Sequence, residues 1–104
     1  MARLLVLYKT PKDATAFDKY YFETHVPIAK KLPGLRKYEV NQGGIGSPAG
    51  DPGIHRIAIL HFDDMAAIQA AFGSPEGQAT VADLGNFAPD PDAVQVLLFE
   101  TRMV

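Results

Sequence analysis

Residues 17–39 read FDKYYFETHVPIAKKLPGLRKYE, which predicts a helix, the signal that ends it and the start of a strand. Asp13 is placed to cap the helix start, because its carboxylate can accept hydrogen bonds from the first free amides. Pro33 and Gly34 end the helix. At about 100° per residue, one set of side chains falls on a narrow arc that we expect to be buried. Its members are Phe17, Tyr21, Thr24, Ile28 and Leu32.

Two residues are unusual in this predicted helix. Pro27 lies inside the apolar pattern, where its missing N–H leaves the carbonyl of Glu23 without a helical partner. We therefore expect a kink beside His25. His25 lies at the edge of the buried arc, and the sequence alone leaves two interpretations open. It is either a core histidine satisfied by a nearby carbonyl or an acid/base group that lines a pocket under the helix.

Composition limits the class of protein. The 104 residues predict one domain, residues 1–104, and 47% hydrophobic with 21% charged residues predicts a globular chain. A formal net charge of −2 argues against nucleic-acid binding, and zero cysteines exclude disulfides and thiolate chemistry. The first residues alternate like a strand rather than a signal peptide, and no apolar run reaches membrane-spanning length. We therefore expect a cytoplasmic protein with no membrane partner.

The order of predicted elements points to one fold. Strands are predicted at residues 3–9, 35–42, 54–62 and 94–100, with a helix after the first strand and two short helices after the third. The order β-α-β-β-α-β predicts a ferredoxin-like α+β sandwich with a four-stranded antiparallel sheet. The first and last strands are apolar on both faces, whereas the helices can cover only one face. We therefore expect a homodimer in which a second copy covers the other face.

Several familiar kinds of site are disfavoured. Residues 43–53 contain GIGSPA, a partial nucleotide fingerprint, but they lead into prolines and a strand instead of a helix. A mobile loop is the favoured interpretation, and gating of a pocket is one role that such a loop could have. His55 and His61 are predicted to share a strand face roughly 20 Å apart, too far to bind one ion, so we expect no metal site. No G-x-S-x-G motif indicates a serine nucleophile.

Aromatic residues gather around the first helix. Most aromatic side chains in a folded domain pack in its hydrophobic core. Several tyrosines and one histidine where helix and sheet meet also fit an apolar pocket for a small organic ligand. We predict His25 as the acid/base group of this pocket and expect four aromatic side chains to bind the ligand: Tyr8, Phe17, Tyr21 and Phe87.

Two motif blocks resemble a known family. FDxYYxxxHxPIAxKLPGLxxYE and the later SPEGQAxxADxxNF are similar to the EthD family, named for a protein associated with ethyl tert-butyl ether degradation. That family belongs to the dimeric α+β barrel superfamily. The resemblance implies a homodimer whose two sheets face each other, with a pocket between the sheet and helices of each protomer.

The resemblance also implies functional residues. His25 and Tyr38 match the family's histidine and strand tyrosine and are expected to be catalytic, and His55 corresponds to a further strand histidine that contacts substrate. The superfamily includes cofactor-free lactone isomerases, which also use a cysteine that this chain lacks, polyketide cyclases and monooxygenases. EthD-like sequences are often labelled reductases, but no nicotinamide or flavin motif is visible here.

The combined expectation is a cofactor-independent acid/base enzyme, of isomerase or cyclase type, for a small hydrophobic ring or carbonyl compound. In this expectation His25 moves a proton and Tyr38 holds an oxygen. The alternative is a noncatalytic protein that binds such a ligand and serves an oxygenase system.

Overall fold

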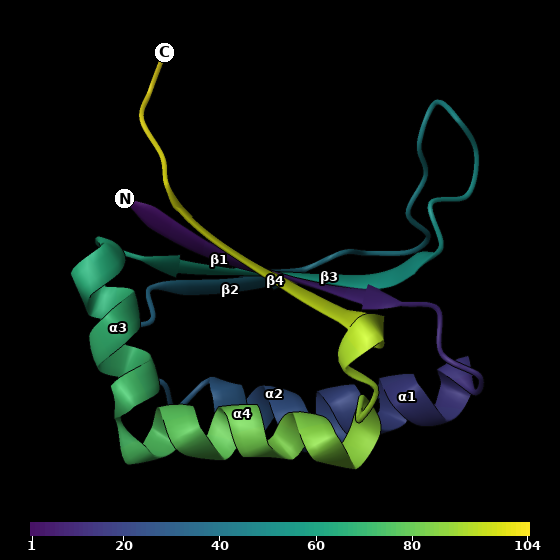
Figure 1. Ribbon diagram of the computed structural model, residues 1–104, viewed down its shortest axis with the longest axis horizontal. Coiled ribbons are helices and arrows are strands. Elements are labelled where there is room, and N and C mark those ends of the chain that lie inside the picture. Colours follow the sequence, from purple (N-terminus) through teal and green to yellow (C-terminus); the bar gives the residue numbers. More distant parts are fainter.

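The computed structural model describes residues 1–104 and confirms the ferredoxin-like α+β fold. The elements follow in the order β1 (Ala2–Lys9), α1 (Ala14–Tyr20), the π-helical turn η1 (Tyr21–His25), α2 (Val26–Ala29), β2 (Lys37–Val40), β3 (Ile54–Phe62), α3 (Met65–Gly73), α4 (Pro75–Phe87), the 3₁₀ turn η2 (Pro91–Ala93) and β4 (Val94–Glu100). The strands form one antiparallel sheet in the order β2-β3-β1-β4, so β2 lies at one edge of the sheet. All four α-helices lie on one side of the sheet (Figure 1).

Side-chain caps fix where the helices begin. The carboxylate of Asp13 accepts a hydrogen bond from the Ala16 amide at 3.0 Å, which confirms the predicted cap of α1. Ser74 ends α3 and caps α4, and its hydroxyl accepts from the amide of Gly77 at 3.1 Å. The chain therefore turns sharply between α3 and α4 at this residue (Figure 1).

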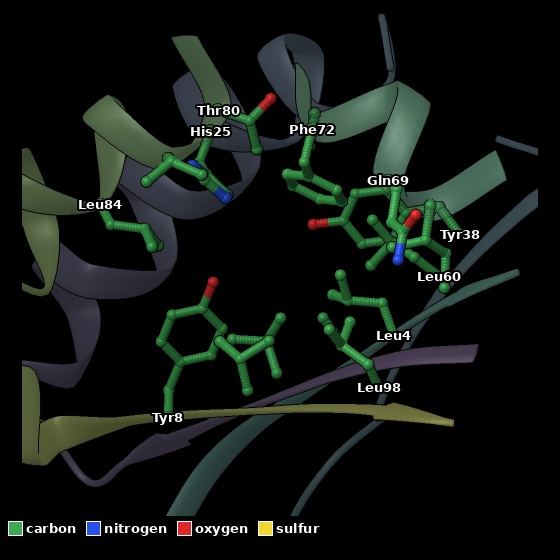
Figure 2. Close-up of a pocket in the computed structure, with 16 residues that line it drawn as sticks. Leu4, Tyr8, His25, Tyr38, Leu60, Gln69, Phe72, Thr80, Leu84 and Leu98 are labelled. Atoms are coloured by element: carbon green, nitrogen blue, oxygen red, sulfur yellow. The ribbon is translucent and has the colours of Figure 1, made fainter. Parts of the chain in front are cut away.

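Gly77 allows α4 to start against the end of α3. A Cβ atom at this position would lie 2.3 Å from the carbonyl oxygen of Ala71 and 2.5 Å from the Cα of Phe72. Both neighbours are backbone atoms, so a larger residue would force the two helices apart. Because the two helices approach so closely, the chain turns sharply between them. Phe72, near the end of α3, extends from this turn toward the sheet (Figure 2).

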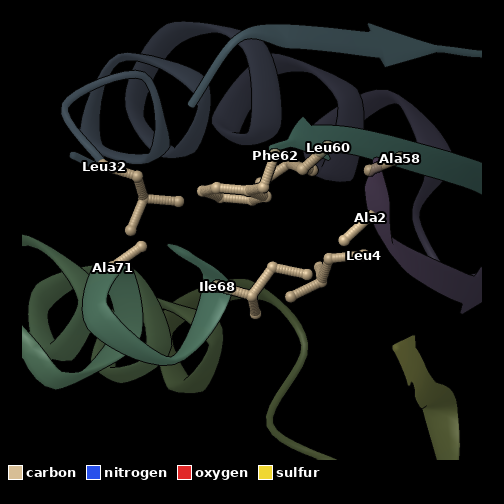
Figure 3. Close-up of a cluster of buried hydrophobic side chains, with 8 residues drawn as sticks. All are labelled: Ala2, Leu4, Leu32, Ala58, Leu60, Phe62, Ile68 and Ala71. Atoms are coloured by element: carbon tan, nitrogen blue, oxygen red, sulfur yellow. The ribbon is translucent and has the colours of Figure 1, made fainter. Parts of the chain in front are cut away.

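The main core lies between the sheet and the helical layer. Eight buried side chains from strands, helices and the segment after α2 meet there: Ala2, Leu4, Leu32, Ala58, Leu60, Phe62, Ile68 and Ala71 (Figure 3). A second cluster, formed by Tyr8, Phe17 and Tyr21, lies toward the other end of the same layer. The cavity described below is lined by members of both clusters.

The first helical segment differs from the predicted buried arc. His25 and Ala29 are buried, whereas Thr24 and Ile28, which were predicted to be buried, are only half-buried. The reason is the π-helical turn η1, in which the amide of Val26 donates to the carbonyl of Tyr21, five residues back. This wider turn contains one extra residue, so the side chains of α2 that follow it are shifted by one position. The irregularity expected near Pro27 is this turn, and it brings His25 into the core.

The face of the sheet opposite the helices is apolar and uncovered. Leu5 pairs with both Ile59 and Leu97 across the central strands of this face. Leu97 and Phe99 on β4 are 42% and 41% exposed. The loop at residues 43–53 and the C-terminal residues 101–104 both rise from the sheet on this side (Figure 1). We call this surface, formed by Leu5, Leu7, Ile57, Ile59, Leu97 and Phe99, the outer face.

Candidate functional site

A cavity of about 310 Å³ lies between the sheet and the helices. Sixteen residues line it, thirteen of them hydrophobic, and none is Asp, Glu, Lys or Arg. They are Leu4, Val6, Tyr8, His25, Ala29, Tyr38, Ala58, Leu60, Ile68, Gln69, Phe72, Thr80, Val81, Leu84, Val96 and Leu98 (Figure 2). The volume and the apolar wall suit a small organic molecule with few polar groups.

His25 is paired with a buried carboxylate. The Nδ1 atom of His25 lies 2.9 Å from Oδ2 of Asp83 on α4, and both residues are buried. The other oxygen of Asp83 accepts hydrogen bonds from the Tyr20 hydroxyl at 2.7 Å and the Asn86 amide at 3.0 Å. Burial alone would raise the pKa of Asp83, but hydrogen bonds from Tyr20, Asn86 and His25 hold this pKa below its ordinary value. Asp83 is therefore ionised at neutral pH.

The charge of Asp83 fixes the tautomer of His25. An ionised carboxylate can only accept hydrogen bonds, so Nδ1 of His25 carries the proton and Nε2 presents a lone pair. Nε2 makes no hydrogen bond within the chain, and the ring borders the cavity (Figure 2). Burial lowers the pKa of His25, although the hydrogen bond and charge of Asp83 act in the opposite direction. The ring is therefore neutral at pH 7 and can act as a base toward a ligand in the cavity.

Two tyrosine hydroxyls border the same cavity, and only one of them has a hydrogen-bond partner within the chain. The Tyr8 hydroxyl has no hydrogen-bond partner in the chain and points into the cavity from β1 toward the His25 side (Figure 2). The Tyr38 hydroxyl on β2 lies 2.6 Å from the hydroxyl of Tyr21. Burial raises the pKa of each of these three tyrosines, so all of them stay protonated at neutral pH.

The structure separates the predicted site residues into two groups. His25, Tyr38 and Tyr8 line the cavity. The other three predicted aromatic residues, Phe17, Tyr21 and Phe87, do not line it and instead pack behind it. Ring centroids of His25 and Phe87 are 4.7 Å apart, and those of Tyr8 and Tyr21 are 5.7 Å apart. These rings hold the cavity residues in place without forming its wall.

His55 lies outside the cavity. Its Nε2 atom is 2.7 Å from Asp18 of α1, and Arg56 donates to the same carboxylate oxygen at 2.9 Å. The prediction that His55 and His61 share a strand face is wrong, because a β-bulge opposite Tyr8 and Lys9 turns His55 toward the helices. His61 instead pairs with Glu39 on the outer side of the sheet. No group of three or more potential metal ligands comes together in the structure.

The glycine-rich loop borders a different cavity. Gly43, Gly44 and Ile45 line a polar hollow of about 480 Å³ together with Asp18, His55 and Arg56. None of these residues belongs to the apolar cavity at His25. A gating role for the loop stays a prediction.

Sequence reasoning missed the carboxylate partner of His25. Asp83 and Asn86 belong to the motif ADxxNF, but no role was expected for either residue. The only available signal was their spacing, since residues three apart in a helix share one face. Pairing that face with His25 requires the packing of α4 against η1, which no local pattern contains.

Comparison with known proteins places the chain in a family. The sequence model described as the EthD domain matches residues 9–91. The chain belongs to the EthD family. It is 37% identical over 89 residues to an uncharacterized 11.0 kDa protein in the thcB-thcC intergenic region of Rhodococcus erythropolis, which covers 85% of this chain and 84% of that protein.

Solved structures agree with this assignment. An EthD family protein from Bacillus halodurans is 34% identical, with a TM-score of 0.88 and coverage of 98% of this chain and 99% of that one. Two more distant structures share the fold alone. SnoaB, a cofactor-independent oxygenase from Streptomyces nogalater, is 14% identical with a TM-score of 0.67, and 99% of this chain and 94% of that chain are covered. A dimeric ferredoxin-like protein of unknown function from Jannaschia sp. is 18% identical with a TM-score of 0.67, and the match covers 96% of this chain and 98% of that chain.

One further property follows from the helices of this EthD-family chain. None of them combines the length and the apolar character needed to cross a bilayer.

Proposed function

We propose that this EthD-family protein is an acid/base enzyme, of isomerase or cyclase type, that acts without a cofactor on a small hydrophobic ring or carbonyl compound. The observation that carries the proposal is the His25–Asp83 pair, which leaves a basic nitrogen free in an apolar cavity. A neutral imidazole, whose ordinary pKa is about 6.5, is well suited to move protons near neutral pH. The description of SnoaB as a cofactor-independent oxygenase supports the proposal by analogy of fold only.

In the proposed reaction His25 takes a proton from the substrate through Nε2 and later returns it at another atom. The imidazolium formed in between is stabilised by the carboxylate of Asp83, which lies 2.9 Å from Nδ1. Tyr38 on the cavity wall holds the oxygen on which negative charge develops. Because the proton only changes position, the overall reaction is an isomerisation or ring closure.

A noncatalytic binding protein is the second candidate, and the largely apolar wall of the cavity favours it. Turnover and binding of a panel of small hydrophobic ketones and lactones, measured for the wild-type protein and for His25→Gln, distinguish the two functions. For an enzyme we expect turnover to fall by about 10²–10⁴-fold while the dissociation constant changes little. Binding by the wild-type protein without turnover of any compound in the panel would favour the binding protein.

We also propose that the protein is a homodimer joined through the outer face. Burial of a large apolar side chain contributes roughly 1.5–3 kcal/mol, and no helix of the chain covers Leu97 or Phe99. The structural relative from Jannaschia sp. is described as dimeric, which supports this arrangement by analogy. His25 lies on the helix side of the sheet, so each protomer would carry its own site.

A further inference from the structure

The wall of the cavity is uncharged, which limits the ligands it can accept. None of the sixteen lining residues carries a formal charge at neutral pH, because none is Asp, Glu, Lys or Arg and burial keeps His25 neutral. The buried guanidinium of Arg56 donates to Asp18 and Asn41 and does not line the cavity. A carboxylate or phosphate on the ligand would lose its hydration without gaining a positive partner, which is unfavourable. The cavity therefore favours an uncharged ligand.

The polar side-chain atoms of the wall are few, and several already have partners in the chain. The Thr80 hydroxyl donates to the carbonyl of Glu76 at 2.8 Å, and the Tyr38 hydroxyl is hydrogen-bonded to Tyr21. The Gln69 amide has no partner in the chain, but it belongs to an exposed residue of α3. Among the buried residues of the wall, two atoms remain without a partner in the chain: the hydroxyl of Tyr8, a donor, and Nε2 of His25, an acceptor. Figure 2 shows the Tyr8 hydroxyl directed across the cavity toward His25. A matching ligand needs an acceptor oxygen beside an acidic hydrogen.

We propose that the ligand is an uncharged, mostly apolar enolisable ketone, whose oxygen accepts a hydrogen bond from Tyr8 and whose acidic α-hydrogen faces Nε2 of His25. This inference rests on the proposed function, because it assumes that the cavity binds a small organic molecule. It adds Tyr8 as the principal donor to the ligand oxygen, with Tyr38 as a second group that is already bound to Tyr21.

The chemical step is balanced without an added oxidant or reductant. The bond between the α-carbon and its hydrogen breaks, and the proton moves to Nε2 of His25. The electron pair left behind forms a carbon–carbon double bond, while the carbonyl π electrons move to the oxygen. That oxygen becomes an enolate, which accepts a stronger hydrogen bond from Tyr8 than the ketone did. Return of the proton to oxygen or to another carbon gives an uncharged product.

Binding of three naphthalene probes tests the ligand class. 2-Naphthol mimics the enol form, naphthalene lacks the oxygen, and 2-naphthoate adds a negative charge. The chain contains no tryptophan, so the fluorescence of the probes can be followed directly. We expect 2-naphthol to bind more tightly than naphthalene and 2-naphthoate to bind at least tenfold more weakly than 2-naphthol. Tyr8→Phe should lower the affinity for 2-naphthol about three- to tenfold and leave that for naphthalene unchanged.

The unchanged affinity for naphthalene also shows that the Tyr8→Phe variant still folds around its cavity. Three results would overturn the inference: tightest binding of 2-naphthoate, an equal loss of affinity for 2-naphthol and naphthalene in Tyr8→Phe, or no binding of any probe by the wild-type protein.

Exchange of the α-hydrogens of 2-tetralone in deuterium oxide separates this inference from the proposed function. We expect the wild-type protein to accelerate exchange above the buffer rate and His25→Gln to abolish the acceleration. In one outcome the three probes bind in the expected order, with weaker 2-naphthol binding in Tyr8→Phe, while the wild-type protein does not accelerate exchange. That result supports the ligand class and contradicts the proposed enzyme. If exchange depends on His25 but proceeds unchanged in Tyr8→Phe, the role of Tyr8 is overturned and the proposed enzyme stands.

Discussion

Nδ1 of His25 and Oδ2 of Asp83 lie 2.9 Å apart although 58 residues separate them in the sequence. This contact joins the π-helical turn to α4 across the back of the cavity. It sets both the orientation of the imidazole ring and the nitrogen that carries its proton. The proposed acid/base chemistry of the site therefore depends on how the two helical segments pack, and not on His25 alone.

Asp83→Asn should impair proton transfer more than ligand binding. The carboxylate raises the pKa of His25 against the effect of burial, so its removal should lower this pKa further. We expect accelerated exchange of 2-tetralone to fall by about 10²-fold or more, because the imidazolium loses its counter-charge. An NMR titration of the His25 ring measures the pKa, and Asp92→Asn in the exposed turn η2 is the control. An unchanged His25 titration in Asp83→Asn would contradict the assigned pairing.

Folding stability should decrease as the pH falls below about 7. His25 takes up a proton near pH 6.5 in the unfolded chain, whereas burial lowers its pKa in the folded protein. Between these two pKa values the unfolded state binds more protons, so the free energy of unfolding falls with decreasing pH, by at most about 1.4 kcal/mol per pH unit for one group. Urea denaturation at several pH values measures this slope.

His25→Gln is the control for this pH dependence. The variant retains His55 and His61, so the difference between the two slopes isolates the contribution of His25. We expect the variant to have a shallower slope between pH 7 and pH 5. Equal slopes in both proteins would show that His25 does not resist protonation in the folded state.

Gly77→Ala should destabilise the protein by about 1–3 kcal/mol, because the added methyl group would overlap backbone atoms of Ala71 and Phe72. Gly85→Ala is a matched control in the same helix, where a Cβ atom would meet nothing within 4 Å. There we expect a gain of about 0.5–1 kcal/mol from the better helix propensity of alanine. Thermal or urea denaturation compares the two variants. Similar stability changes at both positions would contradict the close contact at the corner between α3 and α4.

Pro27→Ala should keep the fold but move the His25 ring. The variant regains a backbone N–H, which favours a regular α-helical turn in place of η1. We expect stability to stay the same or rise by about 1 kcal/mol or less, because the returned hydrogen bond is partly offset by a more flexible unfolded chain. A crystal structure of the variant, or the NMR shifts of the ring, reports its position. An unmoved ring would show that Pro27 does not determine the π-helical turn.

Leu97→Asp should convert the proposed homodimer into a monomer. Leu97 lies on the outer face, where a charge would remain unpaired in a sheet-to-sheet contact. Ala70→Asp places the same charge on exposed α3 and should leave the dimer intact. Sedimentation at low micromolar concentration measures the association state. A well-folded wild-type monomer under these conditions would show that the outer face is not the interface.

The fold was predictable because strand alternation and helix caps are local signals. The face of β1 that carries Leu4 and Tyr8 is the buried one, and Ser74 and Pro75 start α4 as their residue types predict. Periodicity assumes a constant turn, so it could not place the extra residue of η1. It put Thr24 on the buried arc and His25 only at the edge of that arc.

The rest of the site depends on long-range packing. The side of the sheet that His55 faces depends on a bulge opposite β1, and bulges leave little trace in the sequence of one strand. The partnership of His25 and Asp83 depends on how α4 lies against η1, so a single sequence gives only the two separate motifs. Tyr8 was predicted to bind ligand as one aromatic residue among several, and only its unpartnered hydroxyl distinguishes it.

The π-helical turn has a consequence for how this fold diversifies. A deletion of one codon between Tyr21 and His25 would remove the extra residue of η1, so the histidine would occupy the position that an ordinary helical turn directs toward the core and would still face Asp83. Restoring the α-helical turn without a deletion would instead direct Thr24 toward Asp83 and turn the imidazole of His25 toward solvent. The length of this segment and the type of its turn must therefore change together if the scaffold is to keep the proposed base in the cavity.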